Sequence, residues 1–113
     1  MQPLTKVYLL DENGQRFFGD GPCRLLRLVE EKGSLHAAAE EMGMAYTKAM
    51  KLLKQAEAAV GEPLTERVIG GTKGGGSRVT DAGKELMQRY EDYRDRCIAA
   101  DREIYPQVFG GDR

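Results

Sequence analysis

The amino-acid sequence predicts a single α+β domain that is mainly α-helical. Four segments repeat apolar residues at helical spacing, and two pairs of short β-prone runs flank glycine-containing turns. The composition is that of an ordinary globular protein, with 41% hydrophobic and 31% charged residues. The length of 113 residues suits one domain, 1–113, with one core.

The N-terminal residues predict a β-hairpin over 4–19. Residues 4–10 are rich in leucine, valine and tyrosine, and Asn13-Gly14 is the dipeptide that favours a two-residue type I′ turn. Residues 16–18 supply the returning strand. We interpret this hairpin as structural.

Three consecutive helices are predicted over 22–61. Gly33 ends the first, because glycine readily adopts the left-handed conformation that follows a last helical turn. Ser34 caps the second, which stops at Gly43 after about two turns. The third runs from about residue 45 to 60 and ends at Gly61. The apolar stripes expected to face the core are Leu25, Leu26, Leu28 and Val29, then Leu35, Ala38, Ala39 and Met42, then Ala49, Leu52, Leu53, Ala56 and Val60.

A glycine-rich segment, GGTKGGGS at 70–77, joins strands predicted over 64–69 and 77–79. A nucleotide-binding phosphate loop needs G-x-x-x-x-G-K-[ST], and Gly76 stands where that motif requires lysine. A loop tip without a function is the remaining alternative. We interpret 64–79 as a hairpin whose glycines let the backbone approach a partner closely.

The last predicted helix covers 81–105, with Thr80 as its cap and Pro106 as its stop. A helix of about 25 residues is about 37 Å long, which is more than so small a domain can cover. Its apolar residues alternate spacings of four and three, as in a two-helix seam, so we expect a homodimer. A helix packed only on its own domain is the alternative. The predicted seam residues are Leu86, Tyr90, Tyr93, Cys97, Ala100 and Ile104.

Two short helices joined by Met42-Gly43-Met44 form a helix-turn-helix, and the hairpin that follows makes it a winged one. In this motif the N-terminal part of the second helix meets base edges in the major groove of DNA. The whole chain has a net charge of −1, but residues 45–80 carry six lysines and arginines against three glutamates. The candidate DNA contacts from this reasoning are Thr47, Lys48, Lys51, Lys54, Lys73 and Arg78.

Three segments within 24–90 carry a family resemblance: GSLHAAAEEMGMAYTKAMKLL, IGGTKGGGSRVT and TDAGKELMQRY. They resemble the N-terminal DNA-binding domain of the ModE-type molybdate-dependent transcription regulators, a winged helix related to the LysR type. The resemblance implies a homodimer on a near-palindromic operator, with double-stranded DNA as partner. It adds Tyr46 to the DNA face and Gly74 and Gly75 to the wing. The candidate DNA-binding residues are then Ser34, Tyr46, Thr47, Lys48, Lys51, Lys54, Lys73, Gly74, Gly75 and Arg78.

Two departures from the family pattern affect what is expected. Ala45 stands where the family often has a capping serine, so the start of the recognition helix is expected to lose about 1 kcal/mol of stability. Because the chain ends at Arg113, we expect no molybdate-sensing domain and no small-molecule effector within it.

No residue pattern supports an enzyme, a metal site or a cofactor. His36, the one histidine, has no nucleophile motif beside it, and we interpret it as a surface or half-buried side chain, with a phosphate contact as the alternative. Cys23 and Cys97 lack metal-ligand spacing, and the N-terminus lacks a signal peptide, so we expect a reduced, cytoplasmic protein without a membrane span. The leading hypothesis is a sequence-specific DNA-binding transcription regulator. The alternative is a winged-helix module that binds proteins instead of DNA, which the acidic pI of about 5.9 favours.

Overall fold

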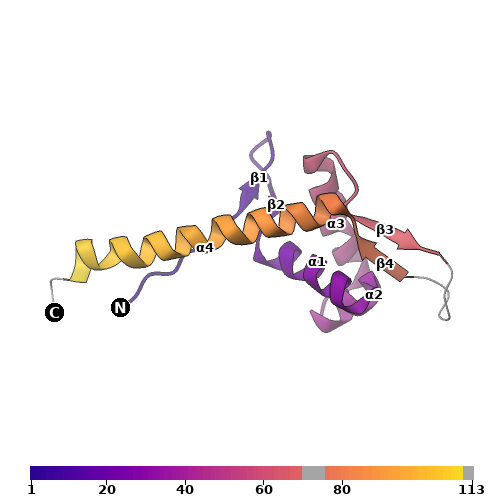
Figure 1. Cartoon of the computed structure of the whole chain (residues 1–113), viewed down its shortest axis with the longest axis horizontal. Helices are drawn as coiled ribbons and strands as arrows, with labels where there is room; N and C mark the ends of the chain where they lie inside the picture. The colour runs from indigo at the N-terminus through magenta and orange to yellow at the C-terminus, as the bar shows by residue number, and fades with distance from the viewer. Residues whose placement is uncertain (70–75, 111–113) are drawn as a thin grey trace.

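The computed structural model describes residues 1–69 and 76–110. Within them, four helices and two small antiparallel hairpins form a compact body from which the last helix extends, giving dimensions of 61 × 29 × 23 Å (Figure 1). This is the mainly α winged helix-turn-helix that the sequence predicts. The elements in chain order are β1 (Leu9–Leu10), β2 (Arg16–Phe18), α1 (Asp20–Lys32), α2 (Leu35–Glu41), α3 (Tyr46–Val60), β3 (Thr65–Val68), β4 (Gly76–Val79) and α4 (Asp81–Phe109).

Helix α1 forms the centre of the core and contacts α2, α3, α4 and both hairpins. Helix α2 has only seven residues and is too short to be stable alone, so packing must hold it. It buries Ala38 and Ala39, whose small side chains allow α3 to cross it closely. On α3, Ala49, Leu53 and Ala56 are buried, whereas the predicted core residue Leu52 is only half-buried at the edge of the exposed face.

The helix ends follow the signals in the sequence. The Ser34 hydroxyl accepts a hydrogen bond from the Ala37 N–H at 3.1 Å, and the Thr80 hydroxyl accepts one from the Gly83 N–H at 3.1 Å. Between α2 and α3, Gly43 takes a left-handed φ of 67°, which turns the chain toward the third helix. Of these features, the left-handed Gly43 lies between the two helices of the motif.

The N-terminal hairpin differs from the prediction in its turn. The Asp11 N–H bonds to the Gln15 carbonyl at 2.8 Å and the Gly14 N–H bonds to the Asp11 carbonyl at 2.9 Å, so three residues form the loop. The predicted two-residue turn is therefore wrong. The Asp11 carboxylate explains the longer loop, because it accepts hydrogen bonds from the N–H groups of Asn13 and Gln15, each at 2.9 Å.

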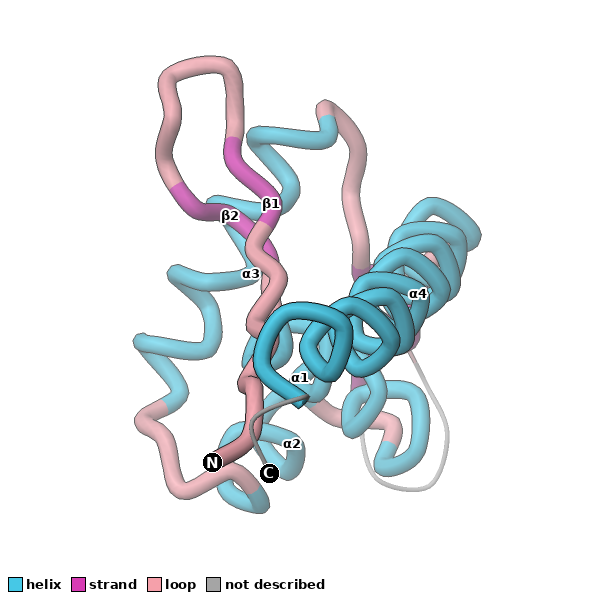
Figure 2. Tube along the Cα trace, turned by 90° about the vertical axis from the view of Figure 1, so that its left-hand side faces the viewer, coloured by secondary structure: helices cyan, strands magenta, loops and turns pink. Residues whose placement is uncertain are grey.

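Most of the predicted first strand is not paired with another strand. The chain before β1 instead runs along α4, as Figures 1 and 2 both show. Tyr90 donates its hydroxyl to the Val7 carbonyl at 2.9 Å, and Tyr105 donates to the Met1 carbonyl at 3.1 Å. The Thr5 hydroxyl also contacts the Asp101 carboxylate. Side chains of α4 therefore satisfy backbone groups that a partner strand would otherwise bind.

Helix α4 continues past Pro106 to Phe109, so the predicted stop at this proline is wrong. A proline removes one hydrogen bond to the preceding turn but leaves its own carbonyl free to accept. The Gly110 N–H bonds to that carbonyl, which closes the last turn. The rings of Tyr105 and Phe109 stack with their centroids 5.1 Å apart, which further supports the extra turn.

None of the helices in the described part of the chain is long and apolar enough to cross a membrane.

Candidate nucleic-acid interface

The outward face of α3 carries the central candidates. Thr47, Lys48 and Lys51 are exposed, and together with Leu52 and Gln55 they line a shallow hollow. Within the described residues, neither lysine forms an ion pair, so both charges are available to a partner. The sequence predicts the lysines and the threonine, whereas Gln55 becomes a candidate only from its place beside them.

A second surface lies between α3 and the base of the wing. It is a groove of about 420 Å³, and it contains the predicted residues Ser34, Tyr46 and Lys54. Two other residues line it that the sequence does not predict, Arg67 on β3 and Ser77 on β4. In the antiparallel pair of β3 and β4, Arg67 lies opposite Ser77. Knowledge of this strand pairing would have been the signal that places the two residues together at the groove.

Two of the predicted cations are partly neutralised. The Lys54 ammonium lies 3.8 Å from the Glu57 carboxylate, and the Arg78 guanidinium lies 2.6 Å from the Glu66 carboxylate across the wing. Arg67 forms no ion pair with any described residue. The unpaired positive charge of the described face therefore comes from Lys48, Lys51 and Arg67.

The base of the wing is anchored to the end of α1. The Ser77 N–H donates to the Gly33 carbonyl at 2.9 Å, and a Cβ added at Gly76 would lie 2.3 Å from that carbonyl oxygen. One glycine of the glycine-rich segment is thus required by close packing within the protein. Lys73, Gly74 and Gly75 lie outside the described residues, so their assignment to DNA remains a prediction.

Ser34 and His36 lie at the start of α2, on the rim of the same groove. The Ser34 hydroxyl is half-buried and engaged as the cap of α2, which limits what else it can bind. His36 is exposed and stacks on Tyr46, with ring centroids 3.7 Å apart and planes inclined by 6°. The surface position of His36 agrees with the prediction from the sequence, whereas the contact with Tyr46 was not predicted.

A polar cluster joins α1 to α4 on another side of the molecule. The Arg27 guanidinium donates to both oxygens of Glu91, with its Nε 3.1 Å from Oε2, and this contact lowers the pKa of the Glu91 carboxyl. Burial, together with the nearby Glu91 charge, raises the pKa of the Cys23 thiol to about 12. Cys23 is therefore a protonated packing residue, and both Cys23 and Cys97 are free thiols. Among the described residues, no group of three or more metal-binding side chains is clustered.

The predicted seam on α4 is exposed only in part. Tyr90 is 1% exposed because its ring packs edge-on against Phe18 in the core of its own chain, so it has no surface to offer a second copy. Tyr93 and Ile104 are 55% and 53% exposed. Ala100 is exposed, and Leu86 and Cys97 are half-buried.

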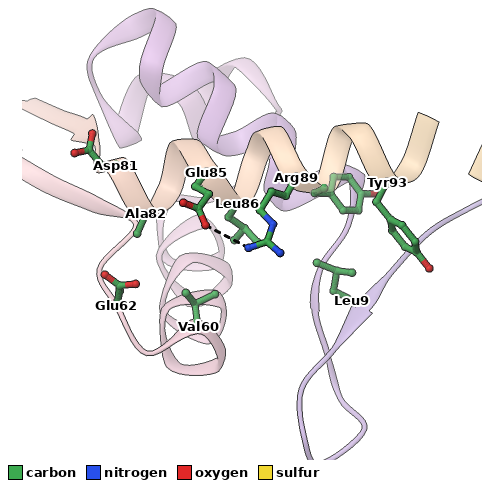
Figure 3. Close-up of a pocket in the computed structure, with 10 residues that line it drawn as sticks. Leu9, Val60, Glu62, Asp81, Ala82, Glu85, Leu86, Arg89 and Tyr93 are labelled. Carbon is green, nitrogen blue, oxygen red and sulfur yellow. Dashed lines mark hydrogen bonds and ion pairs between the residues drawn. The ribbon is translucent and has the colours of Figure 1, made fainter. Parts of the chain in front are cut away.

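Beside Leu86 and Tyr93 lies a groove of about 610 Å³ (Figure 3). Its apolar walls include Leu9 from the N-terminal hairpin and Val60 from the end of α3. Glu62, Asp81 and Glu85 line its edge, and Glu85 pairs with Arg89 at 3.3 Å. The groove continues the exposed apolar row of α4 onto the body of the domain.

The profile of the bacterial regulatory helix-turn-helix proteins of the lysR family matches residues 23–84, from α1 into the first turn of α4. The chain belongs to this family. Membership places it among DNA-binding transcription regulators and not among enzymes, in agreement with the sequence analysis. The match covers the helix-turn-helix, the wing and the first four residues of α4, Gly83 among them.

This lysR-family chain is also similar to the ModE proteins. It is 33% identical to the molybdenum transport protein ModE of Azotobacter vinelandii over 106 residues, which are 91% of this chain and 39% of that protein. It is 38% identical to the Herbaspirillum seropedicae ModE over 84% of this chain and 32% of that protein. The DNA-binding transcriptional dual regulator ModE of Escherichia coli K12 is 33% identical over 68% of this chain and 30% of its own length. The chain thus spans about a third of these relatives, in agreement with the predicted resemblance to a ModE-type N-terminal domain.

Proposed function

We propose that this lysR-family domain binds a near-palindromic DNA operator as a homodimer, with α3 in the major groove and the wing on the backbone or minor groove. The observation that supports this best is the pair of exposed, unpaired lysines, Lys48 and Lys51, beside Thr47 on α3. The opposite face of α3 is buried in the core, so the helix packs with its cations outward. Lysine can donate to guanine O6 and N7 in the major groove, and threonine can bond to base edges.

The groove beside the wing supports a separate role in backbone contact. Lys54 on α3 and Arg67 on β3 both line it, so each of its walls carries a positive side chain, although the carboxylates of Glu57 and Glu66 line it as well. Contacts of this kind neutralise phosphates and fix the register of the protein without reading sequence. Arg67 is the stronger candidate of the two, because Lys54 already has a carboxylate partner in Glu57.

The exposed apolar side chains of α4 support the dimer. Tyr93 and Ile104 are more than half exposed, and Val108, one turn after Ile104, is 67% exposed. A row of exposed apolar residues on a projecting helix is typical of an association surface. We assign it to α4 of a second copy, which would also cover the groove in Figure 3. A two-fold dimer presents two recognition helices, as a near-palindromic site requires.

The test is selection of bound duplexes from a random DNA pool, followed by titration of the selected duplex at several salt concentrations. Lys51→Ala should weaken binding and flatten the salt slope by about one unit if the ammonium contacts phosphate, or reduce discrimination by about 1–3 kcal/mol if it reads a base. Lys84→Ala is the matched control, because Lys84 is exposed on α4 and lines neither of the two surfaces assigned to DNA. A Lys51 variant that matches the wild type in affinity, specificity and slope would refute the assigned face.

The acidic pI of about 5.9 favours a second candidate, a winged helix that binds proteins and no longer binds DNA. The two functions differ at low salt, where a DNA-binding domain binds any duplex through its phosphates. Absence of all duplex binding at low salt would support the protein-binding function and reject the operator.

A further inference from the structure

The stack of His36 on Tyr46 joins the two helices of the helix-turn-helix. His36 is the second residue of α2 and Tyr46 is the first residue of α3. Their rings are nearly parallel, with centroids 3.7 Å apart. This face-to-face arrangement buries one side of each ring against the other, and removing that area from water stabilises the pair. The stack therefore links the start of the recognition helix to α2 by a contact outside the core.

Helix α3 begins without a side-chain cap. Ala45 occupies the cap position with an extended backbone, φ −64° and ψ 145°, and has no side-chain acceptor for the first N–H groups. The Ala45 carbonyl closes the first turn by accepting from the N–H groups of Lys48 and Ala49, each at 3.1 Å. A start of this kind frays more readily than a capped one, unless another contact holds it.

The position of His36 argues that its ring acts through Tyr46. His36 is exposed, and within residues 1–69 and 76–110 its ring forms no hydrogen bond. Tyr46 is half-buried, and both rings line the groove that also contains Lys54 and Arg67. Thr47 and Lys48, the next two residues, point into the candidate interface. Any displacement of Tyr46 would move these two side chains first.

We propose that His36 is a positioning residue for DNA recognition, whose ring holds Tyr46 and thereby the uncapped first turn of α3 in place. The DNA part of this inference rests on the proposed function. The positioning part concerns the free protein and can be measured without DNA. The stack holds the first turn in place, although it leaves the first N–H groups of α3 without a side-chain acceptor.

The test compares His36→Ala, which removes the ring, with His36→Phe, which keeps a ring able to stack but has no N–H or charge. Glu40→Ala is the matched control, because Glu40 is exposed one turn later on α2. In the free protein, His36→Ala should speed amide exchange of Lys48 and Ala49 about fivefold and remove the ring-current shift of the Tyr46 ring protons. His36→Phe should restore both signals, and Glu40→Ala should change neither.

The second arm uses the duplex that the wild type selects from a random pool and an unrelated duplex at low salt. His36→Ala should bind the selected duplex about fivefold more weakly and the unrelated duplex within about twofold of the wild type. His36→Phe should bind both as the wild type does.

The outcomes separate the two proposals. Unchanged amide exchange of Lys48 and Ala49 in His36→Ala overturns the positioning role. If His36→Phe binds the selected duplex as weakly as His36→Ala does, the imidazole itself acts directly, and the positioning role is overturned as well. If the wild type binds no duplex at all, the proposed function fails, while the exchange measurement still supports or overturns the positioning of α3.

Discussion

Gly83 shows how one residue can fix the contact between two elements. An added Cβ would lie 2.5 Å from the Leu64 carbonyl oxygen and 2.6 Å from Val79 Cγ1, so the first turn of α4 sits directly against the end of β4 and the residue before β3. We expect Gly83→Ala to lower the free energy of unfolding by about 1–3 kcal/mol, because the wing must shift to accept the methyl group.

Gly21→Ala provides the control for this prediction. Gly21 lies in the first turn of α1, and a Cβ there would meet nothing within 4 Å. Alanine at this site should be neutral or stabilise by up to about 1 kcal/mol. Urea unfolding of the two variants measures the difference. Equal midpoints would show that Gly83 tolerates a side chain.

The ion pair of Arg27 with Glu91 predicts a dependence of stability on pH. The hydrogen bonds from Arg27 lower the pKa of Glu91 in the folded protein. The pair therefore stabilises the fold fully at pH values above the ordinary pKa of a glutamate, about 4.3. This stabilisation is lost as the pH falls through the lowered pKa of the folded protein. Glu91→Gln should therefore be less stable than the wild type at pH 7, with a smaller difference near pH 3. Denaturant unfolding at both pH values measures this. Glu85, which forms an exposed ion pair with Arg89, offers the control. Glu85→Gln should change the free energy of unfolding little at either pH.

Single residues were predictable from the sequence where their roles are local. Ser34, Thr80 and Gly33 act within one or two turns of themselves, so their types and spacing suffice. Tyr90 was placed on the seam because its spacing fits, but spacing cannot tell which neighbour a helix face meets. The burial of Tyr90 depends on Phe18, which lies far away in the sequence.

At the scale of elements, the start of α3 is the weakest feature of the recognition helix. The extended backbone of Ala45 already has the conformation of a helix cap, so Ala45→Ser should add the missing hydrogen bond. We expect a gain of about 1 kcal/mol in the free energy of unfolding. Ala58→Ser, at an exposed interior position of the same helix, should instead cost a few tenths of a kcal/mol. Thermal unfolding of both variants checks this, and a serine at 45 that fails to stabilise would argue against the cap geometry.

The ends of elements were less predictable than their existence. Pro106 is a strong stop signal, yet α4 passes it because a proline near the end of a helix costs one hydrogen bond and the Tyr105–Phe109 stack supports the last turn. The strand predicted over 4–10 shrank to Leu9–Leu10 because α4 side chains bind the preceding backbone. The first difference comes from contacts within the last turns of α4 that outweigh the proline signal, and the second comes from tertiary contacts that local patterns do not encode.

For the candidate site, the sequence predicted the outward residues of α3 but not the groove beside the wing. Helical periodicity alone places Lys48 and Lys51 away from the buried stripe. The groove depends on how α2, α3 and the wing meet in the folded protein. The place of Arg67 in the groove and the stack of His36 on Tyr46 therefore cannot be predicted from the sequence.

At the scale of the whole molecule, α4 and the body together predict the oligomeric state. If the exposed row on α4 is the dimer surface, Tyr93→Glu should bury an unpaired charge there and yield monomers in sedimentation. Its DNA affinity should fall further than that of a single cation variant, because a two-fold dimer doubles every contact.

Gln88→Glu adds the same charge at an exposed position on another face of α4 and should leave the state of assembly unchanged. A Tyr93→Glu protein that sediments as the wild type does would remove Tyr93 from the interface.

The N-terminal segment bound along α4 also decides where anything joined to the protein emerges. The Met1 carbonyl is held by the Tyr105 hydroxyl at 3.1 Å, and Phe109 lies one turn beyond, so both ends of the described chain share the tip of α4 farthest from the wing (Figure 1). A fluorescent label or fused domain on either end would start from this tip. It would leave the exposed surface of α3 unobstructed. A label at this single point would report on the movement of helix α4.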